Sequence, residues 1–225
     1  VIYHWEWENC QLAGRAGKPH FVGEFGGNQC VGSTCQRDIN LYERGVLLAR
    51  IAINCLQAGA SGLSYWSLLD QYYGRQSDYN AMQQLGLWKS VWRAYAGDSL
   101  YQGLHTDYEV RPQYYAYSLL TRFVRSGAEV YPIPTNDEFY AGMALKNSDG
   151  RWTYVFANAH ATPRHIRLSN RRAPKGTFEV YRYVQQELPT DGRQIQAAAQ
   201  RLRGQTELDY VLPASSVVVF YQTTF

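Results

Sequence analysis

The hydrophobic pattern of this chain changes near residue 128, and that change limits the folds that the chain can adopt. Before it, apolar residues recur at helical spacing, and short apolar runs between the helices indicate strands. Beyond it, apolar and polar residues alternate, and turn clusters such as residues 147–150 separate the runs. We therefore expect parallel βα units over residues 1–128 and an antiparallel β-sandwich over residues 129–225.

The first part contains three expected helices and two expected strands. Asp38 is the expected N-cap of the middle helix, and Gly59 its expected end. Consecutive βα units are joined by a right-handed crossover, so we expect the two strands to be adjacent and parallel. A long loop rich in Tyr, Gln and Gly follows the second strand. The helices are expected at residues 2–13, 39–56 and 112–126, and the strands at residues 20–25 and 62–68.

Five strand-like runs and one short helix make up the expected second part. The helix is expected at residues 196–202. Turn clusters between the runs favour hairpins, which is typical of a small antiparallel sandwich. The strands are expected at residues 138–145, 151–158, 164–169, 177–184 and 215–222.

Charge and hydropathy exclude two classes of protein. The formal net charge is only +3, and Lys and Arg are scattered, with one adjacent pair at Arg171 and Arg172. Such a chain has no basic face for nucleic acid. No run of 18 apolar residues occurs, so we expect no membrane-spanning segment. We also expect no metal or other cofactor, because no CxxC motif occurs and His160 and His165 lie in a turn without thiolate partners.

Four cysteines allow three pairings, among which the sequence does not choose. Cys30 and Cys35 flank a short polar loop, so they are close enough for a local disulfide. Cys10 and Cys55 fall in helical patterns, where we expect small buried side chains.

One carboxylate stands at the end of the first expected strand, in the segment KPHFVGEFGG (residues 18–27). In parallel βα folds, residues at the carboxyl ends of strands face the functional site. Glu24 occupies such an end, and Trp66 occupies the equivalent end of the next strand. A carboxylate beside a large flat ring indicates a site that cleaves sugars. The alternative is that Glu24 pairs with an arginine and Trp66 fills the mouth of a barrel.

Three segments in the same order resemble clan A glycoside hydrolases, the retaining (β/α)8 enzymes that include cellulases and mannanases. KPHFVGEFGG resembles their seventh strand, which carries the nucleophile, and GLSYWSLLDQ (residues 62–71) is similar to their eighth. RPQYYAYSLLTRFVRSGAEVYPI (residues 111–133) resembles the last barrel helix and its exit into a β-sandwich. The resemblance implies an α/β plus all-β chain, namely the C-terminal part of a (β/α)8 barrel followed by an antiparallel β-sandwich.

The resemblance also implies roles for individual residues. Glu24 matches the nucleophile, and Trp66 matches the tryptophan that stacks under the sugar beside the cleaved bond. Asp70, Tyr72 and Tyr73 lie in the following loop and are expected to line the cleft, although no motif assigns them. The substrate is expected to be an oligosaccharide or polysaccharide with β linkages, and the expected location is secreted or periplasmic. The particular sugar and linkage do not follow from these segments.

The motif that carries the general acid/base of these enzymes does not occur in this chain. That residue is a glutamate after an asparagine at the end of strand four, and this chain contains no such pair. A complete barrel takes about 250 residues, and two parallel strands cannot close one. We therefore expect the remaining barrel half, with the acid/base, to be supplied from outside residues 1–225, or the open edge to be covered by self-association. The lone chain should hydrolyse no glycoside.

Two other classes stay open. The first is a non-catalytic carbohydrate-binding protein of the same fold that has lost the second carboxylate. The second is a structural sandwich whose N-terminal helices dock it to a larger assembly. The position of Glu24 argues against the second, because an unpaired buried carboxylate is costly without a function.

Overall fold

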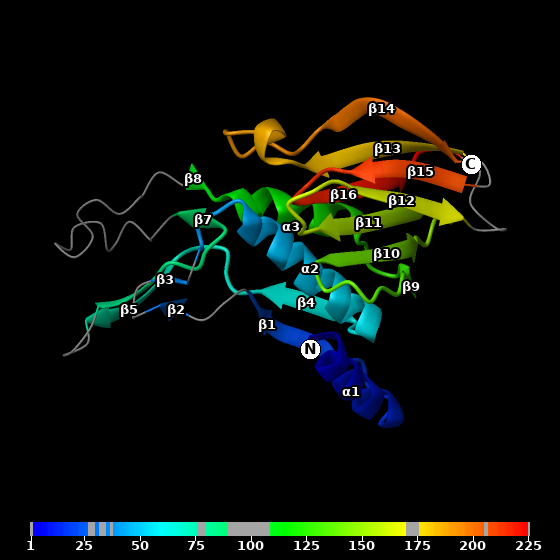
Figure 1. The fold of residues 1–225 in the computed structure, drawn as a ribbon. Coiled ribbons are helices and arrows are strands. Elements are labelled where there is room, and N and C mark those ends of the chain that lie inside the picture. Colours follow the sequence, from blue (N-terminus) through cyan, green and yellow to red (C-terminus); the bar gives the residue numbers. More distant parts are fainter. Residues whose placement is uncertain are drawn as a thin grey trace.

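The computed structural model describes residues 2–26, 30–31, 35–36, 38–75, 80–89, 109–169, 176–204 and 207–224. The chain forms stacked layers with two helices, α2 and α3, in the middle (Figure 1). A pair of parallel strands lies on one side of these helices, and a six-stranded antiparallel sheet lies on the other. The protein is therefore a mixed α/β structure, and the barrel-like part of the described residues is an open wall of two parallel strands.

Three helices form where the apolar spacing indicates them. Helix α1 spans Ile2–Arg15, α2 spans Glu43–Ala58 and α3 spans Pro112–Phe123. Gly59 ends α2 in a left-handed conformation with φ 110°, as expected for a residue without a side chain. None of the helices in the described ranges is both long and apolar enough to cross a membrane.

The expectation that Asp38 caps the middle helix is wrong. The residue that precedes α2 is Tyr42, and it makes no side-chain capping hydrogen bond. Asp38 instead lies in a turn with φ 59°, and its carbonyl accepts the N–H of Leu41 at 3.0 Å. Aspartate tolerates the left-handed backbone conformation that this turn requires. An aspartate in such a turn before the helix does not also cap the helix.

The two expected strands near residues 20–25 and 62–68 are adjacent and parallel, which confirms that prediction. Strand β1 spans Phe21–Phe25 and β4 spans Gly62–Tyr65. Phe21 lies opposite Gly62, and Phe25 lies opposite Tyr65, with a shift in register between them. Their carboxyl ends therefore meet at the same edge.

The second part contains two antiparallel sheets. The six-stranded sheet has the order β14-β13-β16-β11-β10-β9. A separate pair, β12 with β15, covers its far face (Figure 1). The strands of the large sheet are β9 (Glu129–Pro132), β10 (Tyr140–Lys146), β11 (Trp152–Asn158), β13 (Gly176–Tyr183), β14 (Ala197–Gly204) and β16 (Ser216–Gln222). The pair consists of β12 (Arg164–Ser169) and β15 (Glu207–Leu212), and a 3-10 turn (Gln185–Glu187) follows β13.

The expected helix at residues 196–202 is wrong, because these residues form most of strand β14. This strand pairs along β13, with Phe178 opposite Leu202 and Tyr181 opposite Ala197. Sheet pairing overrides the local helix preference of alanine and glutamine. Strand β15 was not among the expected runs, although its buried and exposed residues alternate strictly.

The long loop expected after the second strand contains short antiparallel pairs. Strand β5 (Gln71–Arg75) pairs with β6 (Asn80–Gln83), and β7 (Trp88–Lys89) pairs with β8 (Glu109–Val110). A similar pair, β2 (Cys30–Val31) with β3 (Cys35–Gln36), follows β1. The side chains of Cys30 and Cys35 lie outside the described residues, so a disulfide between them stays a prediction.

Alternate residues of the large sheet enter two different cores. Val217 and Val219 of β16 face α2 and α3, whereas Val218 and Phe220 face β12 and β15. The first core continues through the helices to Phe25 and thus crosses the expected boundary at residue 128. Division of the chain into residues 1–128 and 129–225 stays a prediction.

A pair of tyrosines joins α2 to the large sheet. The rings of Tyr42 and Tyr183 stack with centroids 4.5 Å apart. The Tyr183 hydroxyl donates to the carbonyl of Tyr42 at 2.7 Å, and the Tyr42 hydroxyl donates to the carbonyl of Tyr183 at 3.0 Å. Gly45 makes room for this contact, because a β-carbon there would lie 2.4 Å from the Tyr183 hydroxyl oxygen.

We predict that Gly45→Ala lowers the free energy of unfolding by about 1–3 kcal/mol, because the added methyl group overpacks the tyrosine pair. Gly14→Ala on α1 is the matched control. A β-carbon at Gly14 meets nothing within 4 Å, so alanine should be neutral or stabilise the helix by up to about 1 kcal/mol. Urea unfolding of both variants measures the difference. Equal stability of the two variants would contradict the close packing at Gly45.

Candidate active site

Glu24 and Trp66 lie at the adjacent carboxyl ends of β1 and β4. Phe25 and Tyr65 are buried, and their rings meet edge to face with centroids 5.8 Å apart. Both rings also contact Tyr117 of α3. Glu24 stands directly before Phe25 and is exposed, and Trp66 follows Tyr65 directly after the end of β4.

Glu24 is exposed and available for chemistry. The expectation that its carboxylate is buried is therefore wrong, and the cost of burial no longer argues against a structural sandwich. No hydrogen bond or ion pair joins its carboxylate to any other residue within the described part of the chain. The alternative that Glu24 pairs with an arginine therefore has no support among these residues.

Trp66 is held beside the end of β1 by its backbone. Its N–H donates to the carbonyl of Phe25 at 2.9 Å, which extends the pairing of β1 and β4 by one residue. The indole is 39% exposed, a large value for tryptophan, and the Trp66–Ser67 peptide bond is cis. The carbonyl of Ser67 accepts the N–H of Leu87 at 3.0 Å. The backbone of this turn is therefore tied on both sides, while the indole keeps an open face.

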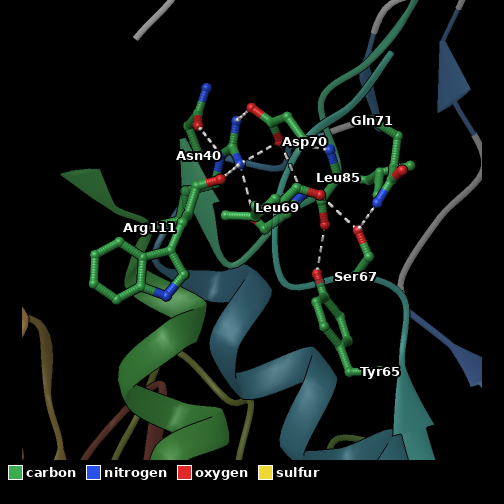
Figure 2. A network of polar contacts seen from close by, with 10 residues as sticks. Asn40, Tyr65, Ser67, Leu69, Asp70, Gln71, Leu85 and Arg111 are labelled. Atoms are coloured by element: carbon green, nitrogen blue, oxygen red, sulfur yellow. Dashed lines mark hydrogen bonds and ion pairs between the residues drawn. The ribbon is translucent and has the colours of Figure 1, made fainter. Parts of the chain in front are cut away.

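A buried ion pair fixes the loop that follows Trp66 (Figure 2). The guanidinium of Arg111 binds both carboxylate oxygens of Asp70, at 2.7 and 2.9 Å. The side chains are 2% and 6% exposed. The Nε of Arg111 donates to Asn40 at 2.8 Å, and one terminal nitrogen donates to the carbonyl of Gly86 at 2.7 Å. Arg111 thus links the loop after β4 to the segments that precede α2 and α3.

Backbone groups complete this network. The N–H groups of Leu85 and Gly86 donate to one oxygen of Asp70, at 3.0 and 2.9 Å. The Tyr65 hydroxyl donates to the carbonyl of Leu85 at 2.9 Å, and burial raises the pKa of that hydroxyl, so it stays protonated. The polar groups around the ion pair are therefore largely satisfied, as a buried charged pair requires.

Three loop residues, Asp70, Tyr72 and Tyr73, were expected to line the cleft, and the structure gives information on the side chain of Asp70 alone. Asp70 has both oxygens occupied by protein donors, which suits the positioning of the loop better than contact with a sugar. Tyr72 and Tyr73 lie in β5, and their side chains fall outside the described residues. Sequence reasoning missed Arg111, whose only signal is its position directly before Pro112 at the start of α3.

Two acidic residues that follow Trp66 in the sequence are both held in ion pairs. Asp70 is bound to Arg111, and Glu109 pairs with the amine of Lys89 at 2.5 Å. A search of the described ranges finds no group of three or more His, Cys, Asp or Glu side chains that could hold a metal ion. The described part of the site therefore offers one carboxylate and one aromatic face.

Comparison with models of protein families and with curated sequences finds no match. Solved structures do match. The catalytic domain of GH30 xylanase C from Talaromyces cellulolyticus is 21% identical with a TM-score of 0.58, and the match covers 92% of this chain and 41% of that one. A GH30 endoxylanase from Clostridium papyrosolvens C71 is 13% identical with a TM-score of 0.62, covering 99% and 46%. The fold of this chain is similar to part of the fold of these GH30 enzymes.

GH30 enzymes are clan A glycoside hydrolases with a TIM barrel and a β-sandwich, so the match agrees with the resemblance in the strand-end segments. A conserved exported protein from Bacteroides fragilis also matches, with 14% identity and a TM-score of 0.64, covering 98% of this chain and 42% of that one. The chain spans less than half of the length of these three structures. At such identities the likeness concerns the fold.

We predict that Asp70→Ala lowers the free energy of unfolding by about 3–5 kcal/mol, because it leaves the guanidinium of Arg111 buried without its counter-charge. Asp149→Ala is the matched control, since Asp149 forms an exposed ion pair with Arg151 at 2.9 Å. That change should cost less than about 1 kcal/mol. Urea unfolding measures both values. Similar small losses in the two variants would show that the network contributes little.

Proposed function

We propose that residues 1–225 form the C-terminal part of a retaining glycoside hydrolase that acts on β-linked glycans. The observation that carries this proposal is the placement of Glu24 and Trp66 at adjacent strand ends. In barrel enzymes this end of the strands carries the active site. The likeness to part of the GH30 fold supports the same conclusion.

Glu24 acts as the nucleophile in this proposal. Its carboxylate oxygen attacks the anomeric carbon, the glycosidic bond breaks, and a second carboxyl group protonates the leaving oxygen. That second group then takes a proton from water, whose oxygen attacks the anomeric carbon and releases Glu24. The two carboxyl groups must be about 5–5.5 Å apart. Asp70 and Glu109 are both held in ion pairs, and we propose that the acid/base comes from outside residues 1–225.

Trp66 supplies a flat apolar face for the sugar ring. Aromatic rings contribute a large contact area with little loss of side-chain freedom, which suits the binding of a pyranose. The Asp70–Arg111 pair positions the turn that carries this indole. Tyr72 and Tyr73 follow in β5, and we propose them as further contacts for the sugar. Because two of the matching structures are xylanases, xylan is the first substrate to test.

The remaining barrel half is the proposed protein partner, and self-association is the alternative. Phe21 is 63% exposed on the open face of β1, and Trp5 is 65% exposed on α1. The outer edges of the two-stranded wall carry backbone groups that further strands would pair. We propose a secreted or periplasmic location, which the match to an exported protein supports.

We predict that the lone chain does not hydrolyse xylan, and that activity appears on co-expression with the polypeptide encoded upstream of Val1. Positioned general acids contribute about 10²–10⁴-fold, and natural leaving groups need that proton. Release of reducing sugar from xylan, measured for the lone chain and for the co-purified complex, tests this. Turnover by the lone chain would show that a second carboxylate lies near Glu24 after all.

We predict that Glu24→Gln lowers turnover of the complete enzyme by roughly 10³-fold or more, because an amide is a poor nucleophile. A second readout needs no acid catalyst. A dinitrophenyl 2-deoxy-2-fluoro-β-glycoside has an activated leaving group, so it should label Glu24 covalently, and peptide mass spectrometry locates the added sugar.

Glu8→Gln is the matched control, because Glu8 is exposed on α1 away from the strand ends. It should keep both turnover and labelling. Normal turnover of Glu24→Gln on an aryl glycoside would remove Glu24 from the mechanism. Glycan binding by the complete protein without labelling or turnover would instead identify a carbohydrate-binding protein of the same fold.

A further inference from the structure

Two thiols lie between α1 and the C-terminal end of α2, outside the candidate active site. Among the cysteines whose side chains the structure describes, Cys10 on α1 and Cys55 on α2 are both free. Cys55 is buried with 1% exposed, as its helical position indicated, whereas Cys10 is partly exposed. The proposed glycosidase chemistry uses neither thiol.

Gly59 allows α1 to approach the last turn of α2. A β-carbon built on Gly59 would lie 3.3 Å from the β-carbon of Cys10 and 3.6 Å from its sulfur. Gly59 follows Cys55 by one helical turn, and its N–H donates to the carbonyl of Cys55. Residues four apart lie on the same face of a helix. Cys10 therefore faces the turn of α2 that carries Cys55.

We propose that Cys10 and Cys55 form a disulfide that joins α1 to the end of α2 when a small-molecule disulfide such as oxidised glutathione is present. The Cys10 thiolate attacks one sulfur of the oxidant, whose S–S bond breaks and releases one glutathione thiolate. The Cys55 thiolate then attacks the Cys10 sulfur and releases the second glutathione. Two protein thiols are oxidised, one glutathione disulfide is reduced, and the two thiol protons pass to the two glutathione molecules.

The order of the two steps follows from exposure. Cys10 is partly exposed and reaches the oxidant, while buried Cys55 meets only the mixed disulfide that forms beside it. A disulfide needs its two α-carbons about 4.4–6.8 Å apart, so the proposal requires that spacing between Cys10 and Cys55.

The surroundings of the pair keep both sulfurs protonated at neutral pH. Burial, and next the carboxylate of Glu6, raise the pKa of the Cys10 thiol. Burial raises the pKa of the Cys55 thiol to about 12, with further contributions from Glu6 and Cys10. Glu6 itself is hydrogen-bonded to the Nε2 of His20 at 2.9 Å. Because only thiolates attack, the cross-link should form slowly at pH 7 and faster as the pH rises.

The cross-link would close the chain between residues 10 and 55 and reduce the entropy of the unfolded state. For a loop of this length in a domain of this size, the midpoint of thermal unfolding should rise by roughly 5–10 °C. This inference is independent of the glycosidase proposal, because it concerns helices behind the strand wall and not the strand ends.

The test uses the 225-residue chain, fully reduced and then incubated with oxidised glutathione at pH 7 and pH 9. Remaining thiols are alkylated, and the peptides are mapped by mass spectrometry. We expect a linked pair of peptides that contain Cys10 and Cys55, the loss of both of these thiols, and formation at least roughly 10-fold faster at pH 9. The melting midpoint should rise by roughly 5–10 °C and return on reduction.

Cys10→Ser is the control, because its partly exposed position should tolerate the change while Cys55 stays in place. This variant should show neither the linked peptides nor the rise in melting midpoint. Glutathione that stays attached to Cys10 with Cys55 unmodified would overturn the proposal. Pairing of Cys10 with Cys30 or Cys35 would overturn it equally.

Discussion

Helices α2 and α3 must bury apolar side chains on two opposite sides, and the rest of the structure depends on this constraint. On one side they cover Phe25 and Tyr65 of the parallel strands, and on the other they cover Val217 and Val219 of the large sheet. Without the helices, neither the parallel strands nor the large sheet could bury the apolar side chains that face them. The helix layer therefore sets where the strand ends lie relative to the antiparallel part (Figure 1).

The polar groups of the candidate site are of two kinds, namely charges that are bound to other protein groups and one charge that is not. Asp70 and Arg111 are buried and bound to one another, so their charges hold a loop in place (Figure 2). Glu24 has no bound partner among the described residues, so its charge stays available to a substrate. Catalysis by positioning needs reactive groups that are held by supporting hydrogen bonds. The proposed function would use the Asp70–Arg111 network in this way.

The open strand wall explains why the proposed function needs more than residues 1–225. Glu24 and Trp66 lie at the ends of a sheet that has two strands within the described residues. A site on such a wall lacks the surrounding loops that orient a sugar and exclude water. Matching structures more than twice as long as this chain are consistent with a site completed by further strands.

The sequence by itself determined the local elements and the residues at the strand ends. The spacing of apolar residues predicted three helices. Gly59 and Pro112 marked one helix end each, because their own backbone preferences favour those positions. The order of helix and strand predicted the parallel pair, and thus that Glu24 and Trp66 share an edge. Only the tertiary structure decided that residues 197–204 pair with β13, that Arg111 binds Asp70 and that Tyr42 stacks on Tyr183. Local preferences act over a few residues, whereas these contacts join segments far apart in the chain, whose burial outweighs the local tendency.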